Sequence, residues 1–271
     1  MSKYSYQIIV PVSFDYTDDF WRKFAAFSPS EPVLTLKYKE RSADPYDIEA
    51  YPDFGNCKVY CVSHSILAIN DDFTDGTIFS QKKDHIGIYS CAMVALYGNL
   101  IRSSTLVMHS SLIEVDGEGI LFTGPSGVGK TTQAELWQEH RNARIVNGDM
   151  VFIHKESDGI FYAYGSPWHG SSEYCLNEKL PLKAIIAPIQ SEKCSIAELK
   201  GIEMLKCVFP EVMLPDWFEG CKELGMSTLD ELLKCTPAYR LECTKDINAV
   251  ETVEKELGTS TCEVLKRLRN I

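Results

Sequence analysis

The sequence predicts an α/β protein, with an α/β core over residues 86–271 preceded by an α+β region over residues 1–85. Apolar segments of strand character alternate with segments of helical spacing from residue 86 onward, which is the pattern of an α/β core. A glycine-rich loop also separates one of these strands from the helix that follows. With 271 residues, of which 45% are hydrophobic and 24% charged, the chain is large and apolar enough to bury its own core.

The N-terminal region contains short segments rich in β-branched and aromatic residues, separated by acidic residues with proline or glycine. Such segments are typical of strands and turns. The elements expected here are strands over 6–12, 33–38 and 58–62, a helix over 18–27, and turns at 44–45, 51–56 and 71–76. No motif in residues 1–85 indicates a chemistry.

The core region is expected to alternate strands and helices to its end. The spacing of its hydrophobic residues switches repeatedly between the 3.6-residue period of a helix and the two-residue period of a strand. The elements expected are a helix over 86–100, strands over 106–115 and 120–123, a helix over 131–139, a strand over 143–147, a hairpin turning at 157–159, a strand over 182–189, mostly helix over 196–235, a strand over 239–243 and a helix over 246–268.

The charge balance limits the partners of this chain. It carries 27 Lys and Arg against 38 Asp and Glu, a formal net charge of -11 at pH 7. A general attraction to nucleic-acid phosphates or anionic lipid is therefore excluded, and any bound phosphate has to be held by local geometry.

Ten cysteines in a chain that begins without a basic and apolar leader favour reduced thiols and a cytoplasmic protein. The longest uncharged stretch, 86–101, has 16 residues and contains glycine, serine and asparagine. A bilayer needs about 20 apolar residues. We therefore expect no membrane span.

One motif carries chemistry. It fits the phosphate-binding pattern G-x-x-x-x-G-K-[ST] and lies between an apolar strand and a helix, as this motif requires. Glycines let backbone N–H groups converge on a phosphate, and the helix N-terminus adds positive potential. The lysine reaches the β and γ phosphates of ATP, and the threonine hydroxyl reaches Mg²⁺. The expected nucleotide-binding residues are Gly124, Pro125, Ser126, Gly127, Val128, Gly129, Lys130, Thr131 and Thr132.

Asp149 is the carboxylate expected beside this loop. It follows the strand after the loop's helix, 19 residues beyond Lys130, which leaves room for one helix and one returning strand. At that edge of the sheet it could hold Mg²⁺ or accept a proton from an attacking hydroxyl. A simple turn aspartate is the alternative.

The segment 109–132 resembles the HPr serine kinase and phosphoenolpyruvate carboxykinase superfamily, in which a histidine-bearing strand pairs through a tight turn with the strand entering the phosphate loop. Further segments that look similar to bacterial HPr-kinase-like proteins are 133–137, 147–149, 165–170, 181–185 and 239–243. The resemblance covers about residues 90–258. It implies a phosphate-loop core of the HPr kinase type, with a mixed sheet flanked by helices.

The resemblance assigns roles to four residues. Lys130 and Thr131 match the phosphate-loop lysine and the Mg²⁺-binding hydroxyl, Asp149 matches the acidic position after the next strand, and His109 matches the active-site histidine. The expected catalytic residues are therefore His109, Lys130 and Asp149, and the expected metal ligands are Thr131 and Asp149. From the residues alone, His109 fits a core histidine equally well.

Two departures from the family pattern stand out. HPr kinases have paired aspartates where this chain has Gly148 and Asp149, so one carboxylate has to serve both the metal and the proton. The long glycine-rich signature of those enzymes is absent, and residues 166–172 occupy its place, so HPr itself is not the expected acceptor. The segment 167–170 is either an active-site rim loop that meets the acceptor or a turn over a packed tryptophan.

The leading hypothesis is an ATP-dependent, Mg²⁺-requiring kinase that phosphorylates a serine hydroxyl of a peptide or protein. A close variant has a short precursor peptide as acceptor and residues 1–85 as a docking region. Carboxykinase-type phosphotransfer on a small oxoacid and a non-catalytic nucleotide sensor are the alternatives. HPr kinases form hexamers, so the resemblance also points to a homo-oligomer, a state that the sequence leaves open. Neither nucleic acid nor membrane is an expected partner.

Overall fold

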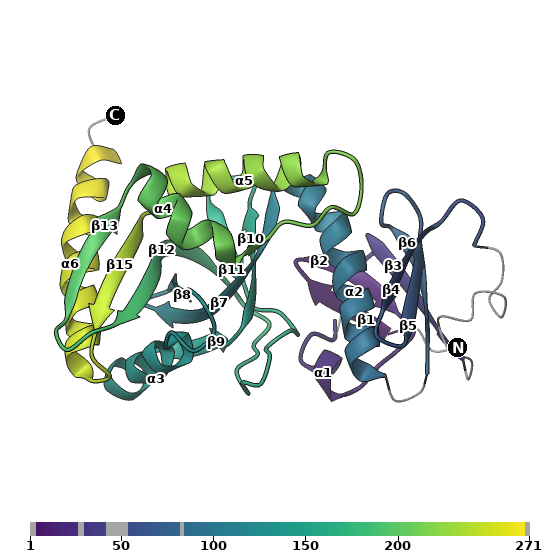
Figure 1. The fold of residues 1–271 in the computed structure, drawn as a ribbon, viewed down its shortest axis with the longest axis horizontal. Helices are drawn as coiled ribbons and strands as arrows, with labels where there is room; N and C mark the ends of the chain where they lie inside the picture. Colours follow the sequence, from purple (N-terminus) through teal and green to yellow (C-terminus); the bar gives the residue numbers. More distant parts are fainter. Residues whose placement is uncertain (1–3, 27–29, 42–53, 82–83, 269–271) are drawn as a thin grey trace. The chain divides into compact units, whose positions relative to one another are not determined.

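The computed structural model describes residues 4–26, 30–41, 54–81 and 84–268, with side chains described as far as residue 258. The chain forms two compact units (Figure 1). Met1–Thr105 and Pro215–Leu224 make the N-terminal unit, and Leu106–Leu214 and Gly225–Ile271 make the core unit. The turn expected at 44–45 and the first half of that at 51–56 lie outside the described residues.

The N-terminal unit is built on a six-stranded sheet in the order β1-β2-β3-β6-β5-β4. Its inner strands, β2, β3 and β6, run parallel, and the remaining neighbours are antiparallel. The strands are β1 (Tyr4–Ile8), β2 (Val10–Phe14), β3 (Leu34–Glu40), β4 (Lys58–Val62), β5 (Ser65–Ile69) and β6 (Asp75–Ser80). The strands and helices of this unit make it α+β, the class that the sequence predicts for residues 1–85.

Two expectations in this unit are wrong in detail. The single strand over 6–12 is a hairpin, because Ile9 adopts a left-handed conformation with φ 63° and the chain reverses there. The helix over 18–27 is only one turn, α1 (Asp19–Arg22). It stops because the backbone at Phe24 and Ala26 bonds to β1 instead of continuing the helix.

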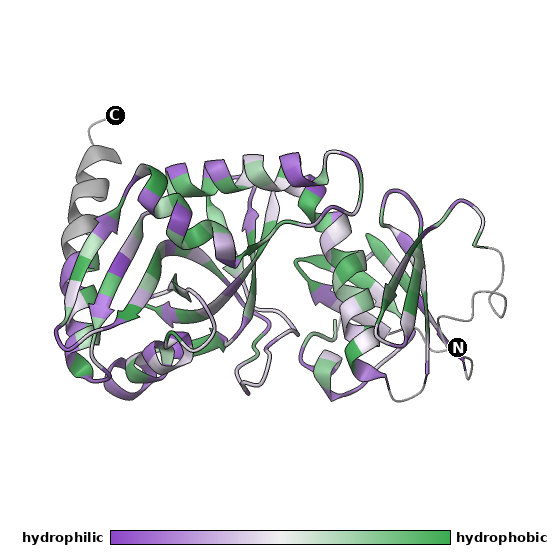
Figure 2. Ribbon diagram, viewed as in Figure 1, coloured by the Kyte–Doolittle hydropathy of each residue, from purple (hydrophilic) through white to green (hydrophobic). Residues whose placement is uncertain are grey.

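Helix α2 (His85–Leu100) belongs to the N-terminal unit and packs against β5 and β6. Most of its residues are buried, and Figure 2 shows it as mainly hydrophobic. The returning segment 215–224 covers part of it, with the Trp217 ring 5.7 Å from that of Tyr97. A short 3-10 turn, η2 (Ile101–Ser103), then ends the unit. The sequence places the boundary between the two regions at residue 85. The N-terminal unit of the structure additionally includes α2 and the returning segment 215–224.

The core unit is a nine-stranded mixed sheet whose main path is β11-β10-β7-β8-β12-β15-β13, with β9 and β14 both paired to β7. Strands β8, β12 and β15 are parallel, whereas β7 runs antiparallel to β8. The strands are β7 (Thr105–Val115), β8 (Glu118–Thr123), β9 (Arg144–Asn147), β10 (Met150–Lys155), β11 (Phe161–Tyr164), β12 (Lys179–Gln190), β13 (Ser195–Leu199), β14 (Val212–Met213) and β15 (Ala238–Cys243). The predicted α/β class is confirmed.

Helices cover both faces of this sheet (Figure 1). The period-2 alternation of β8 sends Ile120 and Phe122 to the core beneath α3 and α6, and Leu121 to the core beneath α4 and α5. All three side chains are almost fully buried. The helices are α3 (Lys130–Arg141), α4 (Gly201–Val208), α5 (Cys221–Cys235) and α6 (Ile247–Leu268), with a 3-10 turn, η3 (Phe209–Glu211), after α4.

The stretch expected to be mostly helix, 196–235, is partly strand. Ser195–Leu199 forms β13 and pairs antiparallel with β15, and Val212–Met213 forms β14 against β7. Both segments complete ladders with strands far away in the sequence. Long-range pairing of this kind overrides the local apolar spacing on which the helical prediction depends.

A first prediction concerns the stability of the sheet beneath the site. Ile186→Ala empties a fully buried position of β12, so we expect a loss of about 2–5 kcal/mol in the free energy of unfolding. Ile189→Ala is the matched control, since Ile189 lies on the same strand and is 44% exposed. Urea unfolding followed by circular dichroism measures both. Equal losses in the two variants would contradict the assigned burial.

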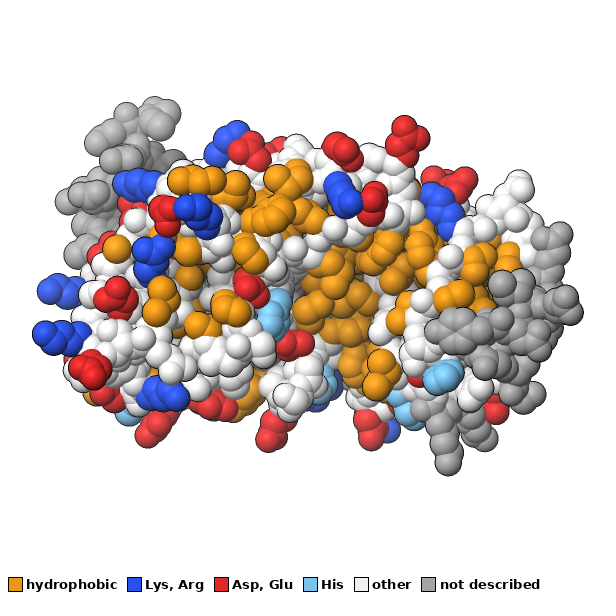
Figure 3. All heavy atoms as spheres, viewed as in Figure 1, with side chains coloured by type: hydrophobic (Ala, Val, Ile, Leu, Met, Phe, Trp, Pro, Cys, Tyr) orange, Lys and Arg blue, Asp and Glu red, His pale blue; other side chains and the backbone are white. Residues whose placement is uncertain are grey.

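The surface carries few further clues. The nine cysteines whose side chains the structure describes are free thiols. None of the described helices is long and apolar enough to cross a membrane. Figure 3 shows hydrophobic side chains over α4 and α5, where Ile202 and Met226 are exposed. A groove of about 330 Å³ lies between these two helices.

Candidate active site

The glycine-rich loop joins the end of β8 to the start of α3, as the motif predicts. Its three motif glycines, Gly124, Gly127 and Gly129, have φ values of 140°, 80° and 113°. Residues with a side chain rarely adopt such values, so glycine is required for the loop to turn its amides inward. Lys130 and Thr131 then form the first turn of α3, at the positive end of the helix dipole.

Lys130 is folded back into this loop. Its Nζ donates hydrogen bonds to the carbonyl oxygens of Gly124 at 2.7 Å and Pro125 at 3.4 Å, and only 7% of the residue is exposed. Burial lowers the pKa of Lys130, and the negative charges of Glu211 and Asp149 oppose that shift. The ammonium group is therefore held inside the loop, and Lys130 lines the pocket beside it.

His109 lies at the mouth of the loop because of the register of β7 and β8. Ser110 pairs with Thr123, the last residue of β8, so His109 is one position further on, beside the start of the loop. The Thr123 hydroxyl donates to the His109 carbonyl at 3.2 Å. The imidazole is thus about one-third exposed, at 34%, and faces the phosphate-binding region rather than the core.

Two carboxylates hold the His109 ring. Its Nε2 lies 3.2 Å from Asp149 Oδ1, and its Nδ1 lies 3.1 Å from Glu211 Oε2. The bond to Asp149 is the main influence that raises the pKa of His109 above 6.5, and the same bond lowers the pKa of Asp149 below 3.8. The contact therefore favours the protonated imidazole of His109 and the ionised carboxylate of Asp149.

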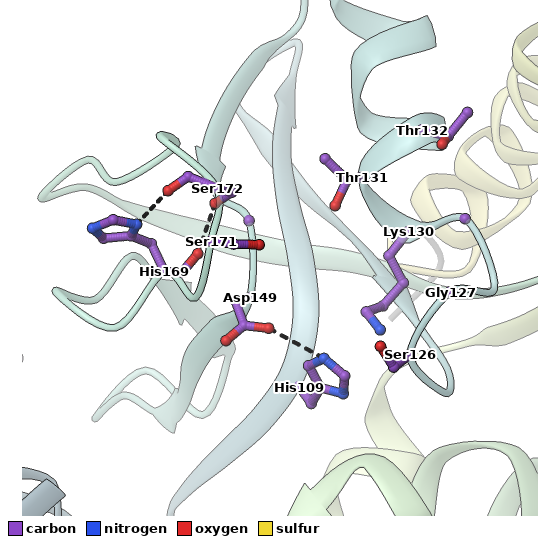
Figure 4. A pocket seen from close by; sticks show the side chains of 12 residues that line it. His109, Ser126, Gly127, Lys130, Thr131, Thr132, Asp149, His169, Ser171 and Ser172 are labelled. Atoms are coloured by element: carbon purple, nitrogen blue, oxygen red, sulfur yellow. Dashed lines mark hydrogen bonds and ion pairs between the residues drawn. The ribbon is translucent and has the colours of Figure 1, made fainter. Parts of the chain in front are cut away.

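Hydrogen bonds of its main chain hold Asp149 in position. It lies in the bend between β9 and β10, where the Asn147 side-chain oxygen accepts its N–H at 2.9 Å. Its carbonyl accepts the N–H of Ser110 at 2.8 Å, and the Asn147 amide donates to Ser166 at 2.9 Å. These contacts leave the carboxylate directed at the pocket, as Figure 4 shows.

The absence of a second aspartate at position 148 has a steric reason. A Cβ atom added to Gly148 would overlap the Ser172 hydroxyl, so no side chain fits there while the 169–172 loop keeps its position. Ser172 is itself anchored, since its Oγ donates to the His169 carbonyl at 2.8 Å. This chain therefore works with one carboxylate at the bend.

These groups line one pocket of about 270 Å³ (Figure 4). The structure brings together all three expected catalytic residues and both expected metal ligands. Of the expected nucleotide-binding residues, Gly124, Pro125 and Val128 belong to the loop but are not among the lining residues. The lining residues are His109, Ser126, Gly127, Gly129, Lys130, Thr131, Thr132, Gly148, Asp149, His169, Ser171 and Ser172.

The donor set suits Mg²⁺ bound through a nucleotide. Within the described residues, no group of three or more His, Cys, Asp or Glu could hold a metal ion by itself. Mg²⁺ typically uses one or two protein oxygens, completes its shell with phosphate oxygens and water, and prefers hard oxygen ligands. The Thr131 hydroxyl and the Asp149 carboxylate, which line the same pocket, fit this role.

Glu211 contacts His109, although no sequence pattern predicts that it lies at this site. Strand β14 pairs Val212 with Met108, which places Glu211 opposite His109 although 102 residues separate them. Its side chain is only 9% exposed. The residues around Glu211 form no recognisable motif. Its contact with His109 depends on the long-range pairing of the two residues of β14 with β7.

A second prediction tests this contact. Glu211→Gln removes a negative charge from His109 Nδ1, so we expect the pKa of His109 to fall from its raised value. The imidazolium, which is retained until the pH rises through the folded-state pKa, would then be lost at a lower pH, together with its contribution to stability. NMR titration of the ring measures the midpoint. Glu203→Gln, an exposed position on α4, is the control, and an unchanged midpoint would contradict the contact.

Fold and site together define an α/β protein with a phosphate-type loop facing a histidine–carboxylate pair. In sequence, the chain is 37% identical over 70 residues to a putative HPr kinase/phosphorylase of Fusobacterium nucleatum and 43% identical over 56 residues to the HPr kinase/phosphorylase of a Geobacillus species. The chain is therefore related to HPr kinase/phosphorylases. The matched segments span 25% and 21% of this chain, but only 11% and 18% of those relatives.

No protein-family model matches the chain. Among solved structures, the HPr(Ser) kinase/phosphatase of Coxiella burnetii aligns with 60% of this chain and 95% of its own, at 10% identity and a TM-score of 0.39. That likeness is too distant to place any residue of this chain.

Proposed function

We propose that this protein is an ATP-dependent, Mg²⁺-requiring kinase that transfers the γ-phosphoryl group to a serine hydroxyl of a peptide or protein. The observation that carries the proposal is a single pocket in which the Lys130 loop faces the His109–Asp149 pair. Phosphoryl transfer needs phosphate positioning, charge neutralisation and a carboxylate near the acceptor hydroxyl. The pocket holds a candidate for each.

The phosphate loop and Lys130 would bind the β and γ phosphates and stabilise the negative charge that moves onto them. Thr131 and Asp149 would hold Mg²⁺. When bound, the ion would supply positive charge that offsets the negative charge of the phosphates. A loop of this kind explains how a chain with a net charge of -11 could bind a polyanion.

The acceptor would enter on the Asp149 side of the pocket. Its hydroxyl oxygen forms a bond to the γ phosphorus as the bond to the β–γ bridging oxygen breaks, and ADP leaves. Asp149 accepts the hydroxyl proton, while His109 holds the carboxylate in place through the 3.2 Å contact. A weak base suffices, because in a loose transition state the nucleophile has formed little bond to phosphorus.

The kind of acceptor is inferred from the relatives and from the pocket. The relatives are named for kinase and phosphorylase activity on HPr, which favours a protein or peptide acceptor here. No arginine is among the residues described as lining the pocket, whereas chemistry on a small oxoacid would need cations for its carboxylates. We further propose the N-terminal unit as the docking region, and the cytoplasm as the compartment, where cysteines stay reduced.

Mass spectrometry tests the proposal. The protein is incubated with ATP, Mg²⁺ and the polypeptides encoded by neighbouring genes, and products are searched for a phosphoryl group on serine. Transfer that disappears when EDTA removes Mg²⁺ is the expected result. Oxaloacetate-dependent nucleotide turnover would contradict the proposal in favour of carboxykinase chemistry. Nucleotide binding without turnover or transfer would contradict it in favour of a sensor.

A further inference from the structure

The loop over residues 169–172 runs directly against the Asp149 carboxylate. Gly170 has φ 60°, and a Cβ added to it would lie 2.8 Å from both Asp149 Cγ and Oδ2. Only glycine allows such an approach. The residue that follows, Ser171, is therefore held next to the carboxylate to which the proposed function assigns the acceptor proton.

The two serines of this loop differ in the hydrogen bonds that their hydroxyl groups make. The Ser172 hydroxyl donates to the His169 carbonyl and fills the space above Gly148, so it has a structural role. Ser171 is exposed, and no hydrogen bond of its hydroxyl is found among the described residues. Figure 4 shows its oxygen pointing across the pocket, toward the side from which Thr131 and Lys130 project.

We propose that Ser171 is a phosphoryl acceptor within its own active site, so that the protein phosphorylates itself on this residue. The inference rests on the proposed kinase function and goes beyond it by naming an acceptor. Ser171 Oγ forms a bond to the γ phosphorus of ATP, the bond from that phosphorus to the β–γ bridging oxygen breaks, and ADP leaves. The hydroxyl proton passes to Asp149 and then to solvent.

Three features support this assignment. The acceptor, the carboxylate and the phosphate loop line the same pocket, so the reaction is intramolecular and gains the advantage of proximity. The product phosphate would lie in the pocket that Lys130 lines, and the lysine ammonium favours an added dianion. The short loop also explains how a serine could reach the pocket without a bound partner.

Incubation with Mg²⁺ and ATP, followed by peptide mapping, tests the proposal. We expect one phosphoryl group per chain on Ser171. Ser171→Ala should remove it, and Ser171→Thr should yield phosphothreonine at the same position, a readout that a merely structural serine would not give. Ser195→Ala, on the exposed strand β13, should incorporate phosphate as the wild type does.

The dilution dependence separates an internal acceptor from one in a second molecule. The expected initial rate per molecule is constant over a 20-fold range of protein concentration, and a rate that rises with concentration would overturn the intramolecular step. Wild-type protein that binds ATP and phosphorylates another polypeptide, but leaves Ser171 unmodified, would reject this inference alone. Failure to bind ATP would reject the kinase function with it.

Discussion

Asp149→Asn is expected to reduce phosphoryl transfer by roughly 10²- to 10⁴-fold, the range for loss of a positioned proton acceptor. The effect should be at the upper end, since the same carboxylate is also the proposed Mg²⁺ ligand and Gly148 supplies no second one. The fold should persist, because the contacts that fix this residue, to Asn147 and Ser110, are made by its backbone. Single-turnover measurement of transfer from labelled ATP gives the rate.

The control for this substitution is Asp230→Asn, which removes an exposed carboxylate on α5 that pairs with Lys234. We expect that variant to transfer phosphate at the wild-type rate. The His109 ring offers an independent readout, since loss of its strongest pKa-raising contact should lower its titration midpoint. A full transfer rate in Asp149→Asn would show that another group accepts the proton.

Lys130→Met is expected to reduce transfer by roughly 10²- to 10³-fold, comparable to the loss of one preorganised donor to transition-state charge. Methionine keeps the apolar stem in its buried position but removes the ammonium group that donates to Gly124 and Pro125. Because the lysine would bind phosphate in the ground state and more strongly in the transition state, KM for ATP should rise and kcat should fall. Steady-state kinetics with varied ATP separates the two.

Lys206→Met is the matched control, since Lys206 is an exposed lysine that pairs with Glu203 on the same helix. It should change neither constant. If Lys130→Met raised KM alone and left kcat intact, the lysine would bind the nucleotide without stabilising charge in transfer. If it changed neither, the loop would not be the phosphate site.

The sequence predicts the part of the site that is local. The glycines of the loop need unusual backbone conformations, and the flanking strand and helix have clear periodicity, so β8, the loop and α3 follow from about 25 consecutive residues. The position of Asp149 follows from the length of one helix and one strand. His109 is identified as functional only through the family resemblance, and the register of β7 and β8 accounts for its position.

The missed features depend on distant pairing. Glu211 is brought to His109 by a two-residue strand, and β13 is a strand only because the edge of β15 is available to it. The hairpin at Ile9 depends on one residue with positive φ, which no propensity predicts for isoleucine. In each case the free energy that stabilises the local structure comes from tertiary contacts, which the local sequence pattern does not predict.

The folded-back position of Lys130 has a consequence for the thermodynamics of nucleotide binding. A free lysine side chain loses about 1.5–2 kcal/mol of conformational entropy when it is immobilised. Here the side chain is already buried and bonded to Gly124 and Pro125, so that cost is met during folding. Phosphate would exchange one set of hydrogen bonds for another. Calorimetry should therefore show a smaller entropic penalty than a loop with a mobile lysine would give.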